Sequence, residues 1–458
     1  MFEFGRDLKR LFGVDAGGES RAAAHREGLT GGDTSLLELL DMRLLTNEAR
    51  SADVAAGRIS AKDRGSRLLE AAIVWRELAR RSGDAAALRK AASHAEAASK
   101  MFESERRQDA LASARCEQAT LAILGADLFG DEGLNAAAGA ALTLARTAPS
   151  QRCGLAMALI AGLDGRAGLA ENNVDRALAA VQGYDAPLRA LAAAKRTKGG
   201  SARLMLADQR AARIELILTC GARLKDRALT QLAITEATAA ATALDADFEP
   251  LTWARLEGLR GSALVQLGEL DGELAHLAKG VEALHAAVGA LSMDHSPMDW
   301  ARAQAALGAG LQAIGEATTS DRAFEQAVTC YDRATQVLKV QPALALRAVV
   351  ANNRALSLAR CAELTADLAV LDAAEMAFKS ELSAQPGARD PALWAVAQLN
   401  LARLYEARVE ITGRDDGRLD RAAVALACAF DVFSELGLRS LTDLAAQGLH
   451  RLKATHAH

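Results

Sequence analysis

The sequence predicts an all-α protein, built as a solenoid of helix pairs that stack one after another. Three of its 4 tryptophans, Trp253, Trp300 and Trp394, lie on one period of 47 residues. We call the periodic positions beats, and Arg347 occupies the beat between Trp300 and Trp394. A small residue follows each beat by eight positions, at Gly261, Gly308, Ala355 and Ala402. Hydrophobic residues make up 50% of the chain, Ala and Leu are the helix formers that dominate it, and there are only 7 prolines. A fixed period of this size is typical of supersecondary units that bury their apolar faces only by stacking.

Charge, cysteine usage and motif content exclude several classes of protein. The 54 basic and 58 acidic residues argue against a broad nucleic-acid surface, because such a surface needs clustered positive charge. The 6 cysteines form no C-x-x-C pair and have no metal-ligand spacing, so we expect free thiols in a reducing compartment. Motifs of zinc proteases, P-loop enzymes and serine hydrolases do not occur. We therefore expect no enzyme activity, no metal and no cofactor.

The amino terminus carries an amphipathic segment. Residues 2–12 place Phe4, Leu8, Leu11 and Phe12 on one face of a short predicted helix. Three roles stay open for this helix: it lies in a membrane interface, it docks into a partner protein, or it caps the exposed end of the solenoid. Since no segment approaches the roughly 18 apolar residues of a spanning helix, we expect a cytoplasmic protein, either free or peripheral at the inner face of the membrane.

The pattern divides the chain into three parts. Residues 1–34 hold the amphipathic helix and a Gly-rich linker, 35–195 hold helical repeats in an irregular register, and 201–458 hold regular repeats with a closing helix. Ser35-Leu-Leu-Glu38 fits a capping box at the start of the folded body. The basic, glycine-ended run Lys195–Gly200 predicts a subdomain boundary or hinge, or equally an ordinary solvated loop. Further helix breaks are expected at Ser82–Asp84, Gly130–Gly133, Pro149–Ser150 and Gly183–Pro187.

Each regular unit is predicted to pair a proline-marked first helix with a second helix. Pro250, Pro297 and Pro391 each precede a tryptophan of the register by three residues, and proline suits the first turn of a helix. A turn is expected near Gly268 and Gly315. Subtracting turns of about five residues leaves helices of roughly 18 residues. The second helices align large apolar side chains at two positions, Leu277, Phe324 and Leu371, and then Leu284, Tyr331 and Phe378.

The glycines at the small position indicate close helix packing. A glycine inside a helix costs about 1 kcal/mol relative to alanine, so Gly261 and Gly308 suggest a steric need. The distance between two helix axes depends on the side chains at their contact. We therefore expect the second helix of each unit to approach the first at this position.

These openings resemble a known family. Pro297–Gly308 and Pro391–Ala402 share the pattern P-x-x-W-A-x-x-Q-x-x-L followed by a small residue, and Pro250–Gly261 matches it in part. They resemble the tetratricopeptide-repeat (TPR) family, and look most like its long-unit bacterial variant. The resemblance is good over about 250–436 and vague over 60–245. It implies a TPR-like α-solenoid of antiparallel helix pairs in a right-handed superhelix, with protein or peptide binding in a concave groove and no catalysis.

The resemblance also implies which residues line that groove. The matching positions lie two, five, nine and twelve residues after each beat, and they are mixed in sign. The candidate groove residues are Arg255, Arg302, Gln312, Asn352, Arg403 and Glu406. The favoured hypothesis is a non-enzymatic scaffold or adaptor that binds a protein or peptide. The alternative is a structural or regulatory accessory subunit of an enzyme or membrane complex that self-associates through its solenoid.

Overall fold

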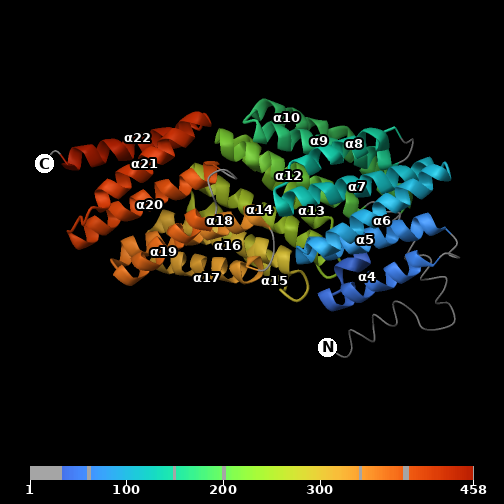
Figure 1. Cartoon of the computed structure of the whole chain (residues 1–458), viewed down its shortest axis with the longest axis horizontal. Coiled ribbons are helices and arrows are strands. Elements are labelled where there is room, and N and C mark those ends of the chain that lie inside the picture. The colour runs from blue at the N-terminus through green and yellow to red at the C-terminus, as the bar shows by residue number, and fades with distance from the viewer. Residues whose placement is uncertain are drawn as a thin grey trace.

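A computed structural model describes residues 34–58, 63–147, 151–198, 203–339, 343–384 and 391–456. Over these ranges the chain consists of helices and connecting turns, without a strand. The predicted amphipathic helix at residues 2–12, with Phe4, Leu8, Leu11 and Phe12, lies outside the described residues, as does most of the linker. Figure 1 follows the chain from its amino-terminal helices at the right, through α14 and α16 in the middle, to α22 at the left-hand end.

Successive helices pack as pairs, which confirms the predicted all-α solenoid of stacked antiparallel helix pairs. We call the first helix of a pair the A helix and the second the B helix. Helices α3 (Ser35–Glu38) and α4 (Met42–Gly57) precede the pairs, α11 (Asp185–Lys198) lies between the third and fourth pairs, and α22 (Arg439–His456) follows the last. The pairs are α5 (Arg64–Ser82) with α6 (Ala85–Ser104), α7 (Gln108–Phe129) with α8 (Gly133–Ala145), α9 (Gln151–Ala170) with α10 (Val174–Gly183), α12 (Arg203–Leu224) with α13 (Arg227–Thr242), α14 (Pro250–Asp271) with α15 (Leu274–Gly289), α16 (Pro297–Thr318) with α17 (Asp321–Leu338), α18 (Leu344–Thr365) with α19 (Leu368–Ala384), and α20 (Pro391–Thr412) with α21 (Arg418–Glu435).

The A and B helices occupy different layers of the solenoid. The B helix α17 buries one stripe, on which Phe324, Ala327, Tyr331 and Ala334 recur at helical spacing. The A helix α14 instead buries residues on several sides of its axis, including the consecutive run Ala263-Leu-Val265. A helix that is apolar around most of its circumference belongs to the interior. The A helices therefore form the inner layer, and the B helices face solvent.

The predicted repeat register is confirmed in the packing. The two aligned positions of the B helices are buried at Leu277, Phe324, Leu371, Leu284, Tyr331 and Phe378. A Cβ atom on Gly261 would lie 2.9 Å from the backbone oxygen of Gly280, and one on Gly308 would lie 2.8 Å from the Tyr331 ring. Real Cβ contacts are not this short, so these glycines permit the close approach of helix B.

The predicted turn positions were wrong by about one helical turn. Gly268 and Gly315 lie inside α14 and α16, which continue to Asp271 and Thr318. The A helices α14 and α16 are each 22 residues long, longer than the roughly 18 residues expected. A Cβ on Gly268 would lie 2.7 Å from the Leu277 side chain, so this glycine serves a helix contact rather than a turn. The chain turns instead at left-handed residues, such as Gly272 with a φ of 69°.

The other predicted breaks have mixed outcomes. Helices end at Ser82 and Phe129 before Gly83 and Gly130, as expected. Between Gly183 and Pro187 the interruption is only Tyr184, because α11 begins at Asp185. Pro149–Ser150 lies outside the described residues, and α11 continues through Lys195 to Lys198.

Within the described ranges, one helix is long and apolar enough to cross a membrane by length and composition. Contrary to the expectation from the sequence, the window Cys153–Ala170 in α9 has a mean hydropathy of 1.3 over 18 residues. This window includes Ala156, Ala158 and Ala161, which are buried in the hydrophobic core. The core helix of a globular fold passes the same test, and α9 is an A helix of the third pair.

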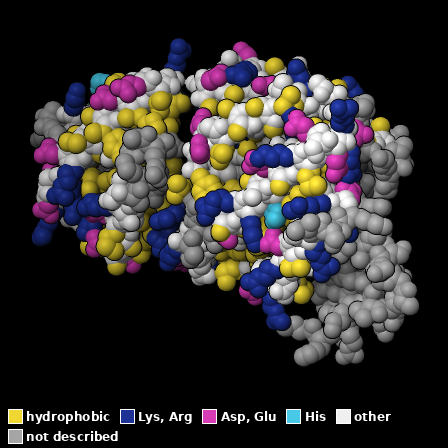
Figure 2. Space-filling view, turned by 45° about the vertical axis from the view of Figure 1, so that its right-hand side comes forward, with side chains coloured by type: hydrophobic (Ala, Val, Ile, Leu, Met, Phe, Trp, Pro, Cys, Tyr) yellow, Lys and Arg dark blue, Asp and Glu magenta, His cyan; other side chains and the backbone are white. Residues whose placement is uncertain are grey.

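The solenoid contacts itself beyond neighbouring pairs. Helix α5 of the first pair touches α16 of the sixth, and α7 of the second touches α18 of the seventh. Leu128 at the end of α7 is fully buried in a cluster with Met298, Ala301 and Leu338. These contacts bring the sixth and seventh pairs of the solenoid against its first two pairs. On the surface in Figure 2, basic, acidic and apolar side chains are interspersed over the visible face.

Candidate functional site

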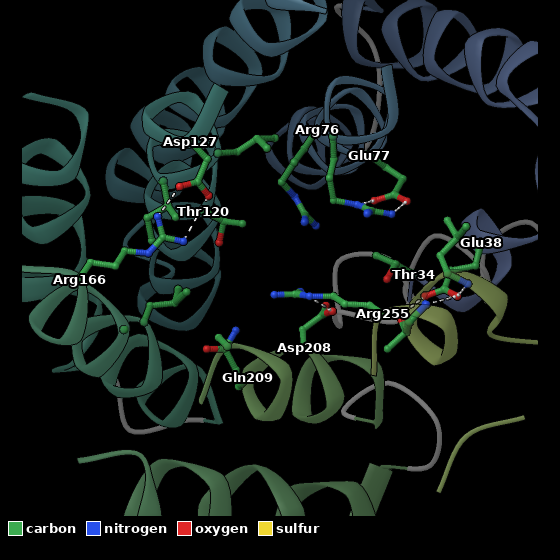
Figure 3. Close-up of a pocket in the computed structure, with 18 residues that line it drawn as sticks. Thr34, Glu38, Arg76, Glu77, Thr120, Asp127, Arg166, Asp208, Gln209 and Arg255 are labelled. Atoms are coloured by element: carbon green, nitrogen blue, oxygen red, sulfur yellow. Dashed lines mark hydrogen bonds and ion pairs between the residues drawn. The ribbon is translucent and has the colours of Figure 1, made fainter. Parts of the chain in front are cut away.

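A polar cavity lies inside the ring formed by the A helices α5, α7, α9, α12 and α14 (Figure 3). Its volume is about 230 Å³. At about 30 Å³ per molecule, this corresponds to roughly eight waters. Its lining residues, which define the central cavity below, are Thr34, Glu38, Arg76, Glu77, Arg80, Thr120, Ile123, Leu124, Asp127, Leu159, Gly162, Arg166, Asp208, Gln209, Ala212, Leu251, Thr252 and Arg255. Charged side chains from helices that are far apart in the sequence thus converge on one space.

Helix α3 closes one side of the cavity through Glu38. This carboxylate accepts hydrogen bonds from the backbone N–H groups of Leu251 at 3.0 Å and Thr252 at 3.2 Å, and from the Thr252 hydroxyl. It therefore caps the amino terminus of α14, where backbone donors lack helical partners. The predicted capping box was wrong: α3 has Thr34 as its N-cap, without a side-chain hydrogen bond. Burial raises the pKa of Glu38 to about 7, against the opposing effect of the Thr252 hydrogen bonds.

Arg81 and His295 hold α3 in this position. The Arg81 guanidinium is fully buried and donates to the carbonyl oxygens of Leu37 at 2.5 Å and Leu40 at 2.7 Å. The His295 Nε2 atom lies 2.6 Å from the carbonyl oxygen of Glu38. Because a carbonyl oxygen only accepts, Nε2 carries the proton and donates. Burial lowers the pKa of His295, and the charge of Arg81 lowers it further, so a neutral ring is favoured.

Each arginine that lines the cavity is paired with a carboxylate. Arg76 Nε donates to Glu117 Oε1 at 2.6 Å, and Arg255 Nη2 lies 2.9 Å from Glu215 Oε1. Arg166 forms an ion pair with Asp127. The α5 residue Arg80 bridges Glu77 on its own helix, at 2.8 Å, and Asp299 on α16, at 2.7 Å. The Arg80–Asp299 ion pair joins the first and sixth helix pairs.

In this network, burial shifts each pKa toward the value that favours the neutral form, and the charge of the ion-pair partner shifts it in the opposite direction. Burial alone would raise the pKa of Glu77, but Arg80 and Arg81 bring it well below its usual value. Burial likewise opposes the charge of Arg80, but Asp299 and Glu77 raise its pKa well above the usual value. Both groups are thus charged across the physiological pH range. Their ion pairs belong to the folded structure.

Two adjacent residues of α12, Asp208 and Gln209, lack a hydrogen-bonded partner of this kind among the described residues. The nearest cation to Asp208 is Arg255, whose Nη1 lies 3.8 Å away, beyond hydrogen-bond distance. Nearly half of the Asp208 side chain is exposed, at 47%, and in Figure 3 the side chain points into the ring. Burial within the molecule raises the pKa of Asp208, since the attraction of Arg255, Arg80 and Arg76 is weaker than the desolvation. Gln209 is 8% exposed, and its Oε1 has no hydrogen-bond partner among the described residues.

The structure separates the groove residues that the sequence had grouped together. Arg255 alone among them lines the central cavity. Arg302 lies 3.4 Å from Asp299 on its own helix α16. In the carboxyl-terminal half, Arg403 is exposed on α20, and Glu406 lies 3.2 Å from Arg451 of the closing helix.

Gln312 and Asn352 lie within the stack of A helices. Gln312 Oε1 accepts from Ser357 Oγ on α18 at 3.1 Å and from the Tyr331 hydroxyl at 3.3 Å. Asn352 is 5% exposed, and its Oδ1 lies 3.5 Å from Asn400 Nδ2 on α20. These two side chains link neighbouring pairs of the solenoid.

The sequence analysis missed most residues of the central cavity. These residues lie mainly in the amino-terminal half of the chain, where the repeat register is irregular. Arg76, Glu77, Arg80 and Arg81 recur at i, i+1, i+4 and i+5 in α5, which places them on one helix face, and in the sequence this pattern is typical of a solvated face. Buried charges are rare unless they are paired. What the sequence lacked was any indication of which distant helices supply their partners.

The described residues show no group of three or more His, Cys, Asp or Glu side chains placed to hold a metal ion. All six cysteines are free thiols. The lining of the central cavity offers hydrogen-bonding and charged groups.

Comparison with known proteins gives similarity at the level of the chain trace. No protein-family model matches the sequence, and no curated protein matches it. A Rap protein solved in complex with Competence and Sporulation Factor has 12% identity and a TM-score of 0.44, covering 89% of this chain and 99% of its own. The nuclear import adaptor Nro1 of S. pombe has 15% identity and a TM-score of 0.36, covering 61% and 94%. A STAND protein with a tetratricopeptide-repeat sensor, from Pyrococcus horikoshii, has 12% identity and a TM-score of 0.44, covering 85% and 56%. The helix pairs of this chain form an α-solenoid.

Proposed function

We propose that this chain is a non-catalytic scaffold or adaptor that binds a protein or peptide along the inner face of its solenoid. The observation that carries the proposal is the central cavity, on which charged side chains from the first five A helices converge. Solenoids present extended inner surfaces for binding. The Asp208 carboxylate is incompletely paired, since its nearest cation, Arg255 Nη1, lies 3.8 Å away, and this favours a site that a ligand completes.

Two matched threonine substitutions test this proposal. Thr120 lines the central cavity from α7, whereas Thr143 is exposed on the B helix α8. Each hydroxyl donates at 2.9 Å to the carbonyl oxygen four residues earlier. Thr120→Phe places a ring in the cavity, and Thr143→Phe adds the same ring to the outer surface. Proteins captured from the source cell by the wild type, and then purified, should bind the Thr120→Phe variant at least about ten-fold more weakly and the Thr143→Phe variant unchanged. Equal binding to both variants contradicts the proposal.

We also propose that residues 2–12 dock the scaffold to a partner or to the inner face of the membrane. The support is the apolar face formed by Phe4, Leu8, Leu11 and Phe12 in the sequence. Liposome flotation of the full chain, compared with a chain that starts at Gly18, distinguishes the two targets. Loss of flotation in the shorter chain supports membrane attachment, and equal flotation removes it.

Self-association as an accessory subunit is the second candidate function. Three large apolar side chains near the carboxyl-terminal end favour it, since Met376 on α19 is 70% exposed, Val424 on α21 is 64% exposed and Leu444 on α22 is 50% exposed. Burial of these side chains against a second copy of the chain would favour association. Size-exclusion chromatography with light scattering tests this candidate: a dimer that persists on dilution supports it, and a monomer favours the scaffold.

A further inference from the structure

The arginines of the central cavity differ in how many of their donors are used. Arg80 and Arg166 each donate to carboxylates through both Nη nitrogens. Arg76 donates through Nε alone, to Glu117 at 2.6 Å, so its Nη1 and Nη2 atoms have no acceptor among the described residues. Arg255 donates through Nε and Nη2 to one carboxylate oxygen, and its Nη1 has no acceptor within the same ranges. The hydrogen bonds that these two side chains leave unmade are therefore those of donors.

The open donors face one part of the cavity. In Figure 3 the side chains of Arg76 from α5 and Arg255 from α14 point inward, toward the same region as Asp208. Arg255 Nη1 lies 3.8 Å from Asp208 Oδ1, beyond hydrogen-bond distance. The Arg76 side chain is only 18% exposed, and donors in such a place are costly to leave unpaired. An acceptor that enters here would receive hydrogen bonds from two helices that are far apart in the sequence.

Both guanidinium groups are charged. Burial opposes the charge of Arg76, but Glu117 and Glu77 raise its pKa above the usual value. Glu215 raises the pKa of Arg255 against the opposing effect of burial. The planar guanidinium group matches the oxygens of carboxylate and phosphate, and its hydrogen bonds to such anions are stronger than those to neutral acceptors. The open donors therefore favour an oxyanion.

The charge around the cavity favours an oxyanion with a single charge. The arginines that line the cavity or pair with its lining are Arg76, Arg80, Arg81, Arg166, Arg255 and Arg302. The carboxylates of the same network, apart from Glu38, are Glu77, Glu117, Asp127, Asp208, Glu215 and Asp299. These two sets are equal in number, and Glu38, with a pKa of about 7, is partly protonated near neutral pH. A carboxylate disturbs this balance less than a doubly charged phosphate does.

Asp208 lies beside the same donors and would face the incoming anion. Burial raises the pKa of Asp208 against the attraction of Arg255, Arg80 and Arg76. A second carboxylate nearby raises this pKa further, because two like charges disfavour each other. Asp208 can then take up a proton from solvent, and the hydroxyl so formed donates a hydrogen bond to the anion. The ligand would thus complete the pairing of Asp208 together with that of the two arginines.

We infer that the central cavity binds a carboxylate group between Arg76 and Arg255, supplied either by an Asp or Glu side chain of a bound peptide or by a free small organic acid. The cavity of about 230 Å³ has room for such a group together with some of its water. This inference rests on the proposed function insofar as the inner face is the binding face.

The test begins with probes that isolate this chemistry. N-acetyl-glutamate amide supplies one side-chain carboxylate, N-acetyl-glutamine amide is its neutral isostere, and inorganic phosphate is the doubly charged comparator. Isothermal titration calorimetry of the full chain should detect the glutamate probe at concentrations up to about 10 mM, the range expected for single-residue ligands. The glutamine probe should not bind, and phosphate should bind more weakly than the glutamate probe. If the glutamate probe does not bind, the cavity holds water only and the inference is overturned, as it is if phosphate binds more tightly.

A matched pair of arginine substitutions locates the binding. Arg76→Lys keeps a cation that can pair with Glu117 and removes the two open Nη donors, so it should weaken binding of the glutamate probe about ten-fold. The control is Arg354→Lys on α18, because Arg354 Nε also donates to a carboxylate at 2.6 Å, that of Asp332, and Arg354 does not line the cavity. The control should bind the probe as the wild type does. Equal binding by Arg76→Lys and the wild type would overturn the inference.

A third variant should increase the affinity, which damage to the fold does not explain. Asp208→Asn replaces a carboxylate by an amide that donates a hydrogen bond without first taking up a proton. At neutral pH it should bind the glutamate probe about three-fold more tightly than the wild type, or better, because a like charge has been removed. Unchanged or weaker binding would show that Asp208 does not face the bound group and would overturn the inference.

A peptide arm distinguishes the source of the carboxylate and separates this inference from the proposed function. Selection of a random peptide library, with both ends of each peptide blocked, should enrich Asp or Glu at one position on the wild type. The enrichment should disappear on Arg76→Lys. Binding of the glutamate probe without any selected peptide would support the carboxylate site, with a free acid as its ligand, and count against the scaffold. Selected peptides without an acidic preference would support the scaffold and overturn the carboxylate site.

Discussion

Glu38 caps helix α14 at Thr252, a residue 214 positions further along the chain. In an open array of repeats each unit contacts only its neighbours, and stability is approximately a sum of local terms. Glu38 departs from that scheme, because a carboxylate that precedes the first pair supplies the acceptors for the fifth. The Arg80–Asp299 ion pair makes a second such link between α5 and α16.

The titration of Glu38 should make stability depend on pH. Its pKa rises from 4.5 in the unfolded chain to about 7 in the folded protein, so between these values the folded state binds more protons. Stability from the protonated group is therefore fully present below pH 4.5 and is lost as pH rises through about 7. The full shift corresponds to about 3 kcal/mol. We expect the wild type to lose stability between pH 5 and pH 8 relative to Glu38→Gln, measured by urea unfolding at both pH values. A constant difference between the two proteins would contradict the shifted pKa.

Breaking the Arg80–Asp299 ion pair should loosen the contact between α5 and α16. Arg80→Gln and Asp299→Asn should each lower the free energy of unfolding by about 2 kcal/mol, because each leaves a buried charge with fewer partners. A double-mutant cycle should give a coupling of about 1 kcal/mol or more. The exposed Lys100–Glu96 pair within α6 serves as the matched control and should show no measurable coupling. Hydrogen exchange should rise at both α5 and the start of α16 in the single variants.

Alanine should have opposite effects at two helical glycines. In Gly261→Ala the new Cβ would lie 2.9 Å from the Gly280 oxygen and 3.0 Å from the Leu284 nitrogen, and backbone atoms cannot move aside cheaply. We expect a loss of about 1–3 kcal/mol. Gly139→Ala in α8 meets nothing within 4 Å, and should gain up to about 1 kcal/mol from helix propensity. Thermal melts of both variants measure the difference, and a stabilised Gly261→Ala would refute the close packing of α14 and α15.

The six thiols should react at two distinct rates. Cys153 and Cys428 are partly exposed, whereas Cys116, Cys220, Cys330 and Cys361 are buried. Burial also raises the pKa of the Cys220, Cys330 and Cys361 thiols, which lowers their thiolate fraction. A chromogenic disulfide reagent should therefore titrate two thiols quickly in the native protein and six in denaturant. Rapid reaction of all six without denaturant would show that the described core is not formed.

Residues within one repeat were predictable, because their environment recurs. Phe324 is equivalent to Leu277 and Leu371 of the neighbouring units, and Tyr331 is equivalent to Leu284 and Phe378. Periodicity alone therefore predicts their burial. The glycines were predicted in part. Gly308 packs closely against Tyr331, as expected. Gly315 was assigned to a turn, but it lies inside α16 and faces the Phe324 ring of α17. Glycine signals both a turn and a close approach, and the sequence does not distinguish the two.

The cavity could not be predicted in the same way. Arg80 and Asp299 are 219 residues apart and occur once, so no periodic pattern relates them. Glu38 fits a local capping box by sequence, but its side chain instead reaches a distant helix. The candidate groove positions came from the regular repeats, where the register was clear. The charged ring lies largely in the half where the register was weak, which is why Arg255 alone was common to both.

The cap on α14 also constrains how the protein is made. During synthesis the carboxylate of Glu38 leaves the ribosome long before Thr252 has been translated, so for more than 200 residues it has none of its final donors. The earliest repeats can form helices and pair locally, but their ring stays unfinished until the fifth pair emerges. We therefore expect nascent fragments that stop short of α14 to be susceptible to proteases and aggregation, and folding to become cooperative only once α14 is exposed.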